Sequence, residues 1–300
     1  MNITKYEKYF FILPAVLSIA ALISIGMWGL KPGIDLAGGS LLQISYTGTT
    51  VPSETQVRDA VSSLSIGAVR VQPTNNNGYI LRQRDLTNDE KNSLEAALGK
   101  LGTIHEDQFT SVGPTLGAEL VRKAWIAITL VVLCIILFIA FAFRGVSKPV
   151  ASWKYGIVAI ITLLHDVLVP LGLFAALGYF LGAEVDSLFI VGLLTILGIS
   201  INDTIVVFDR IRENLRLNEE RSKREAFDEV VGRSITQTIA RSINTSLTVI
   251  IVLVALYFLG PVSTKDFALT LIVGMVAGTY SSIFLAAPLL VVWERLQKKN

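Results

Sequence analysis

Six apolar stretches dominate this chain, and each is long enough, or nearly so, to cross a membrane as a helix. A helix that spans the hydrocarbon core of a bilayer needs about 20 apolar residues. Of the 300 residues, 52% are hydrophobic and 17% are charged, a balance typical of a polytopic membrane protein with a modest soluble part. The predicted spans are 9–30, 124–143, 155–181, 187–208, 243–259 and 267–292.

The basic residues predict how these spans are oriented. Lys and Arg precede the first span, follow the second, close the chain, and number eight between 209 and 243. The connections on the other side, around 182–186 and 260–266, hold only Lys265. Since Lys and Arg are retained in the cytoplasm, we expect both termini to be cytoplasmic. We interpret 1–30 as a cytoplasmic start with a retained helix rather than a cleaved signal, because its apolar core is longer than that of a usual signal peptide and an even number of spans requires it to stay.

The segment 31–123 is predicted to be an extracytoplasmic domain between the first two spans. Strand patterns at 41–46, 68–72, 79–82 and 103–112 alternate with two helices that begin at capping boxes, Ser53 with Gln56 and Thr87 with Glu90. The order βαββαβ predicts a small α+β ferredoxin-like fold, an interaction scaffold without a function of its own. Five further membrane helices are expected in 124–300.

A cytoplasmic segment, 209–242, separates the fourth and fifth spans. Its second half carries apolar residues at helical spacing, from Phe227 through Val230, Val231 and Ile235. This pattern predicts an amphipathic helix that lies on the inner membrane surface and runs into the fifth span.

Asp203, next to Asn202, lies near the inner end of the fourth span. A carboxylate inside a bilayer is costly unless it is paired, hydrated or protonated, so its presence suggests proton chemistry. Arg241, at the start of the fifth span, is close enough along the helix for a pair with Asp203 to be geometrically possible. The alternative is that Asp203 is a static polar clasp between helices.

The third span carries a second polar pair, His165 and Asp166, near the middle of the bilayer. Either a role in proton transfer or a hydrogen-bonded clasp fits Asp166, and for His165 we favour a bond between helices. Gly274 and Gly278 predict close helix packing in the sixth span. Other classes of function are disfavoured: the sequence offers no nucleophile, metal cluster, cofactor loop or basic nucleic-acid face. We therefore expect no enzyme, no cofactor and no bound metal.

A dense turn follows the first span and contains Gly33, Asp35, Gly38 and Gly39. Glycines at this density allow backbone conformations and close approaches that other residues cannot make. A hinge between membrane and soluble domain and a tight connector both fit this pattern.

Several motifs together carry a resemblance to a known family: Gly33-Ile34-Asp35-Leu36-Ala37-Gly38-Gly39, His165-Asp166, and Asn202-Asp203-Thr204 within 200–214. The chain resembles SecF, the smaller membrane subunit of the bacterial SecDF protein-export complex, in the RND superfamily. The resemblance implies half of an RND-type transporter, with SecD as a heterodimeric partner that supplies six more helices.

The resemblance also implies a place of action and partners. SecF-like proteins lie in the bacterial cytoplasmic membrane and use the proton-motive force in the late, SecA-independent stage of preprotein export with the SecYEG channel. In that family the positions of Asp203 and Arg241 are tied to proton flow, with protons as the coupling ion. Two alternatives share this architecture: half of an RND-type small-molecule or lipid exporter, and a purely structural subunit that stabilises a partner.

Overall fold

The computed structural model describes residues 7–48, 51–74, 77–142, 150–221 and 225–299. The chain divides into two compact units. The first comprises Met1–Lys31, Ala127–Ala183 and Leu188–Asn300, and the second comprises Pro32–Ile126 with Glu184–Ser187.

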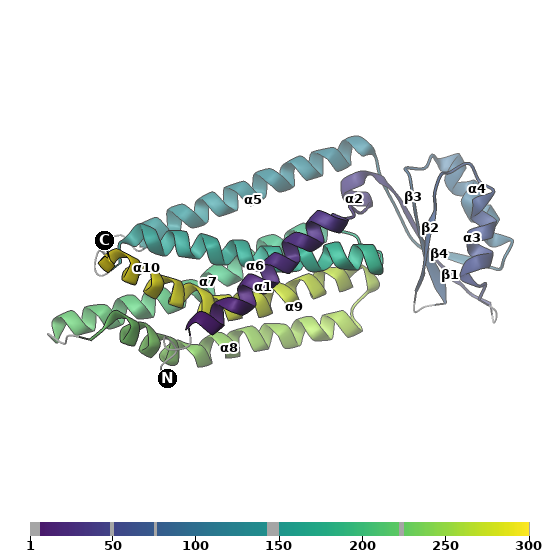
Figure 1. Cartoon of the computed structure of the whole chain (residues 1–300). Coiled ribbons are helices and arrows are strands. Elements are labelled where there is room, and N and C mark those ends of the chain that lie inside the picture. Colours follow the sequence, from purple (N-terminus) through teal and green to yellow (C-terminus); the bar gives the residue numbers. More distant parts are fainter. Residues whose placement is uncertain (1–6, 49–50, 75–76, 143–149, 222–224, 300) are drawn as a thin grey trace. The chain divides into compact units, whose positions relative to one another are not determined.

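Six helices in the described part of the chain are long and apolar enough to cross a membrane, which confirms the predicted polytopic helical fold (Figure 1). The sixth is interrupted near its middle by a π-helical turn, η3, and follows a short 3-10 turn, η2. The helices are α1 (Glu7–Trp28), α5 (Pro114–Ala142), α6 (Ser152–Phe180), α7 (Ser187–Glu220), α8 (Phe227–Leu259), and the sixth, built from η2 (Val262–Thr264), α9 (Lys265–Ser281), η3 (Ser282–Ala286) and α10 (Ala287–Lys299).

The segment 209–242 forms the end of α7 and the start of α8, and its packing differs from the prediction. The predicted surface helix is the first part of α8, and its apolar stripe is buried: Phe227, Val231 and Ile235 belong to the same core as Phe208 and Ile211 of α7. The stripe therefore packs against protein and needs no membrane surface to cover it. The position of this helix relative to a membrane surface stays a prediction, because α7 continues well beyond its apolar part and supplies the protein surface on which the stripe packs.

Small residues allow the helices of the membrane unit to approach closely. A Cβ atom on Gly172 of α6 would lie 2.3 Å from Cα of Ala21 on α1, and Ser24 donates a hydrogen bond to the Gly172 carbonyl at 2.7 Å. In α9, a Cβ atom on Gly274 would lie 2.2 Å from Cδ1 of Ile196 on α7. Glycine at these two positions therefore sets the distance between α1 and α6 and between α7 and α9.

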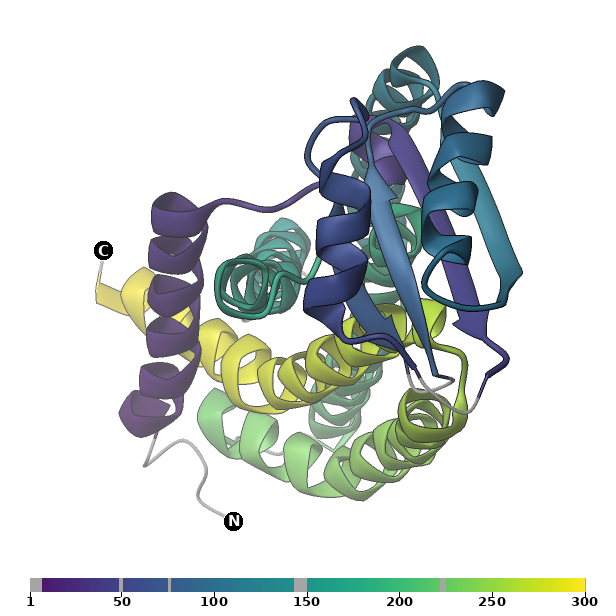
Figure 2. The ribbon, with the colours of Figure 1, turned by 90° about the vertical axis from the view of Figure 1, so that its right-hand side faces the viewer.

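The second unit is an antiparallel sheet with two helices on one face (Figure 2). The strand order is β2-β3-β1-β4, and the element order βαββαβ confirms the predicted α+β ferredoxin-like domain. Both capping boxes form, at Ser53 and at Thr87. The elements are α2 (Ile34–Ala37), β1 (Gly39–Tyr46), α3 (Glu54–Ser62), β2 (Arg70–Thr74), β3 (Gly78–Gln83), α4 (Asn88–Gly99) and β4 (Ile104–Val112).

The core of this domain lies between the sheet and its helices. Leu42 and Leu81 from the sheet meet Leu94 and Leu98 from α4, and all four side chains are fully buried. The alternation along β1 explains this arrangement, because every second residue of a strand faces the same side.

Candidate functional site

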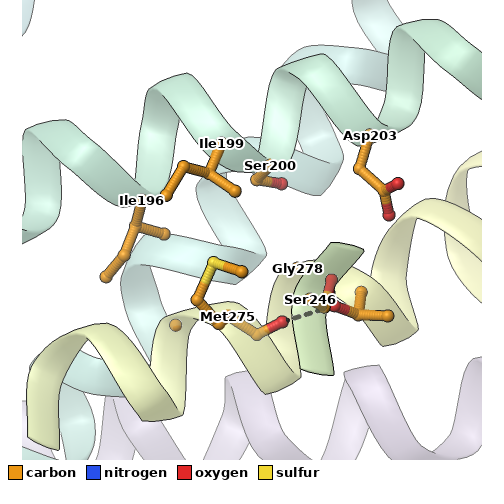
Figure 3. Close-up of a pocket in the computed structure, with 9 residues that line it drawn as sticks. Ile196, Ile199, Ser200, Asp203, Ser246, Met275 and Gly278 are labelled. Carbon is orange, nitrogen blue, oxygen red and sulfur yellow. Dashed lines mark hydrogen bonds between the residues drawn. The ribbon is translucent and has the colours of Figure 1, made fainter. Parts of the chain in front are cut away.

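Asp203 lies on α7 and lines a small cavity of about 10 Å³ inside the membrane unit (Figure 3). One of its carboxylate oxygens, Oδ2, is buried and has no hydrogen-bond partner among the described residues. The Ser242 hydroxyl of α8 interacts with this carboxyl group, although Ser242 Oγ also makes no hydrogen bond of normal geometry within the described chain. The carboxyl group therefore has unused hydrogen-bonding capacity, which a proton or a water molecule can fill.

The walls of this cavity come from three helices, α7, α8 and α9. Most of the lining is apolar, and the polar groups are small hydroxyls next to the carboxyl group. In α9, Thr279 donates a hydrogen bond to Ser246 Oγ of α8 at 2.6 Å. The lining residues are Ile196, Ile199, Ser200, Asp203, Ser246, Gly274, Met275, Gly278 and Thr279.

Asp166 is completely buried near the middle of α6. Its Oδ1 lies 2.8 Å from Nδ1 of His165, and its Oδ2 accepts a hydrogen bond from Ser200 Oγ of α7. His165 is also buried, and its Nε2 has no hydrogen-bond partner in the described part of the chain. Asp166 and Asp203 interact electrostatically. The structure thus brings three of the predicted site residues together, with Ser200 between the two acids.

Arg241 and Asn202 lie elsewhere. Both side chains are exposed, and within the described residues Arg241 makes no ion pair with Asp203. The reason is the helical rotation of about 100° per residue: Ser242 and Ser246 occupy the buried face of α8, so Arg241 points to another. The geometrically possible pair is therefore not formed in this isolated chain.

The exposed face of α8 that contains Arg241 is polar over two turns. Asn244, Thr245 and Thr248 follow Arg241 at helical spacing, and all are exposed. Exposed Arg and Asn side chains are unfavourable against lipid. This face is therefore suited to contact with protein or water rather than hydrocarbon.

The glycine motif after the first span lies in the soluble unit. Gly33 N–H donates to the Val185 carbonyl at 2.8 Å, and Asp35 accepts hydrogen bonds from the backbone and hydroxyl of Ser187. Gly38 has a φ of +80°, and a Cβ atom on Gly39 would lie 2.6 Å from the Gln83 carbonyl oxygen. These contacts explain the glycines as close approaches, while the hinge role stays a prediction.

The residues that the sequence analysis missed are hydroxyls. Ser200 contacts Asp166, and Thr204 Oγ1 lies 2.9 Å from Ser282 Oγ, at the start of the π-helical turn. A signal for Ser200 was present, because it precedes Asp203 by three residues and so shares its helix face. No group of three or more His, Cys, Asp and Glu side chains in the described regions could hold a metal ion.

The chain is similar to known proteins over nearly its whole length. The family described as Protein export membrane protein SecD/SecF, C-terminal, matches residues 93–296. The Protein translocase subunit SecF of Thermobaculum terrenum is 42% identical, over 98% of this chain and 94% of that protein. The protein of the same name from Anaerolinea thermophila is 37% identical, over 100% of this chain and 96% of its own length.

Two solved structures are similar to the chain. The crystal structure of SecDF, a translocon-associated membrane protein from Thermus thermophilus, matches with a TM-score of 0.84 and 30% identity over 98% of this chain. SecDF in a super-membrane-facing form matches with a TM-score of 0.71 and 30% identity over 100% of this chain. The chain spans 39% of the length of each of these SecDF chains.

Proposed function

Because the chain belongs to the SecF family of protein translocase subunits, we propose that it couples proton flow across a bacterial cytoplasmic membrane to the late stage of preprotein export. The single observation that carries this proposal is Asp203, whose buried Oδ2 has no hydrogen-bond partner among the described residues. Its cavity is bounded by three membrane helices. An acid in this setting is suited to gain and lose a proton.

The energy available from each proton is sufficient for such coupling. A proton crossing the membrane potential contributes about 2.3 kcal/mol per 100 mV, and a pH gradient adds about 1.4 kcal/mol per unit. A charged and a neutral Asp203 favour different surroundings, because a carboxylate requires water or a cation where a carboxylic acid does not. A few kcal/mol is enough to shift a two-state arrangement of helices.

The polar face of α8 supports a membrane partner. Arg241 and Asn244 are exposed at this face, and Asn202 is exposed on α7. We propose that a SecD-type subunit covers these side chains, so that contacts with the partner set the position of Arg241. The length of the SecDF chains agrees with this proposal, since this chain spans 39% of them.

The remaining partners and the orientation follow from the same proposal. We place both termini in the cytoplasm and the ferredoxin-like domain outside the membrane, where it would meet a preprotein emerging from a SecYEG channel. The excess of Lys and Arg in the connections assigned to the cytoplasm supports this orientation. Protons would be the coupling ion, with no bound cofactor.

Asp203→Asn tests the proposal. The variant should assemble with a SecD-type partner and lose the stimulation of export by an imposed proton gradient, because an amide cannot hold an exchangeable acidic proton. Asp209→Asn is a matched control, since Asp209 is an exposed acid further along α7 in an ion pair with Arg212. Reconstituted vesicles with SecYEG and SecA provide the assay.

The outcomes of this assay distinguish proton coupling from a purely structural role. Loss of stimulation with normal co-purification of the partner supports coupling. Normal stimulation in Asp203→Asn would refute it. Loss of the partner from the complex in this variant, with no separate export defect, would instead support a structural subunit.

A further inference from the structure

A second buried acid lies close to Asp203 and has no part in the proposal above. Asp166 is completely enclosed, at 0% exposure, and each of its oxygens contacts a polar side chain. His165 Nδ1 lies 2.8 Å from Oδ1, and Ser200 Oγ contacts Oδ2. An ionisable side chain buried this deeply in a membrane unit is a candidate functional group. Its contacts with His165 and Ser200 indicate which groups could exchange a proton with it.

Ser200 connects the two acids because it contacts one and shares a cavity with the other. Its hydroxyl donates to Asp166, and its side chain lines the cavity with Asp203 (Figure 3). The cavity volume of about 10 Å³ is at the lower limit for one water molecule. The polar groups at its wall, Ser200, Asp203 and Ser246, give such a water two to three hydrogen-bonding partners.

Gly278 of α9 keeps this junction open. A Cβ atom at this position would lie 3.2 Å from Ser200 Oγ and 3.6 Å from Asp166 Oδ2. A methyl group here would press on the hydroxyl and occupy part of the space beside it. Glycine at position 278 therefore allows close helix packing and also leaves room beside the hydroxyl that lies between the two acids.

We propose that Asp166, with His165 and Ser200, is a second proton-holding site that exchanges its proton with Asp203 through one water molecule in the cavity; this rests on the proposed proton coupling. In the exchange, the Asp203 carboxylic acid gives its proton to the water, and the water gives one to Ser200 Oγ. Ser200 passes its own hydroxyl proton to Asp166 Oδ2. The products are an Asp203 carboxylate, an Asp166 carboxylic acid, and water and serine unchanged.

His165 supplies a second atom at which this site can take up a proton. Its Nε2 is buried without a hydrogen-bond partner in the described residues, while its Nδ1 contacts Asp166. An imidazole can therefore accept a proton at Nε2 and release one from Nδ1 to Asp166. The proposed proton path therefore ends at His165 Nε2 on one side and at Asp203 on the other.

In the part of the chain that the structure describes, few other ionisable groups face this site. On α8, Arg241 is exposed on a different face from the cavity. On α9, the hydroxyl of Tyr280 donates to the Phe10 carbonyl at 3.1 Å. Between Phe10 and Trp28, α1 carries no ionisable side chain, although it packs against α6. The proton balance of the site therefore depends on Asp166, His165 and Asp203.

Asp166→Asn separates this proposal from a static clasp. An asparagine has nearly the same shape, and it can still accept a hydrogen bond from Ser200 and donate one to His165 Nδ1. A clasp would therefore survive the substitution. A proton-holding site would not, because the amide cannot take up the proton.

The experiment uses the full complex with its SecD-type partner in vesicles, and measures proton-driven export and the number of protons taken up on acidification. Ser200→Ala should slow proton-driven export by about tenfold or more, the size expected from losing a hydrogen bond to a charged group. Asp166→Asn should slow export at least as much, because the amide cannot take up the proton, and so should Gly278→Ala, because the methyl group takes space beside Ser200. Asp166→Asn should also take up one proton fewer. Two controls are Ser281→Ala, a buried serine that bonds its own helix, and Gly198→Ala, where a Cβ meets nothing within 4 Å.

The outcomes distinguish failure of this inference from failure of the proposed function. Slow export in the three variants and normal export in the two controls supports the second site. Normal export and normal proton uptake in Asp166→Asn, with Asp203→Asn inactive, would overturn the second site and leave the proposed function intact. Normal export in Asp203→Asn would overturn both.

Discussion

The soluble domain and the membrane unit differ in whether acidic side chains are buried. In the domain, charges lie at the surface and are paired: Arg84 with Glu90, and Lys91 with Glu106 at 2.7 Å. In the membrane unit, Asp166 is wholly buried, and Asp203 keeps one buried oxygen without a hydrogen-bond partner among the described residues. Exposed pairs contribute little to stability, whereas a buried acid is costly. The difference fits our proposal that the buried acids serve proton coupling, while apolar packing stabilises both units.

Leu98→Ala should have the largest effect on stability and should confine it to the domain. Leu98 is fully buried between α4 and the sheet, so the truncation leaves a cavity and should cost about 2–5 kcal/mol. Hydrogen exchange of the strand amides in the full chain measures this loss. Val51→Ala, at an exposed position, is the control. An equal loss of protection in α6 and α7 would show that the two units do not unfold separately.

Gly172→Ala should have the next largest effect, in the membrane unit. The new methyl group would overlap Ala21, so α1 and α6 must separate, at about 1–3 kcal/mol. Thermal unfolding of the purified chain measures the change. Gly26→Ala on α1 meets nothing within 4 Å and should be neutral. If both variants melted alike, close packing would not hold these helices together.

Thr87→Ala should have a smaller and local effect. The Thr87 hydroxyl accepts from Glu90 N at 3.3 Å as part of a capping box, and removal of a capping side chain costs about 1 kcal/mol. Faster hydrogen exchange in the first turn of α4 is the expected result. Asn92→Ala, at an exposed position inside the same helix, should leave that turn unchanged. Unchanged exchange in Thr87→Ala would count against the cap.

Glu90 should give the smallest effect, a pH dependence of stability that is confined to the acid range. Its bond to Arg84 lowers the pKa of Glu90 from 4.5 to about 2. The stability that it contributes is therefore complete above about pH 4.5 and is lost as the pH falls toward 2. Glu90→Gln should flatten the pH dependence of domain stability in this range, and the exposed Asp59→Asn is the control. An unaltered pH dependence in Glu90→Gln would contradict the pairing.

Features set by neighbouring residues were predictable from the sequence. The two capping boxes depend on side chains three residues apart, and the domain fold follows from strand alternation and their spacing. The six spans follow from length and hydrophobicity. Each of these patterns is formed by residues that are close in the sequence, so the sequence pattern itself indicates the structure.

Features that depend on distant residues were not predictable in the same way. Glu184 is bound by Arg70 at 2.9 Å and by Arg82 at 3.3 Å, more than 100 residues away in the chain, so no local pattern indicates that 184–187 belongs to the soluble unit. Ser200 was missed because a serine in an apolar helix has many structural uses. The pair between Arg241 and Asp203 was judged possible from the depth of Arg241 along the helix. The contacts of Arg241 depend instead on which face of α8 it occupies, and that face is exposed.

Infrared spectroscopy of the complex at successive pH values, with Asp203→Asn as the reference, tests proton binding by Asp203 most directly. We expect an absorption from a protonated carboxylic acid that appears on acidification, disappears at high pH, and is missing from the variant. An identical spectrum for the two proteins at every pH would mean that Asp203 keeps one charge state, and proton coupling at this residue would be contradicted.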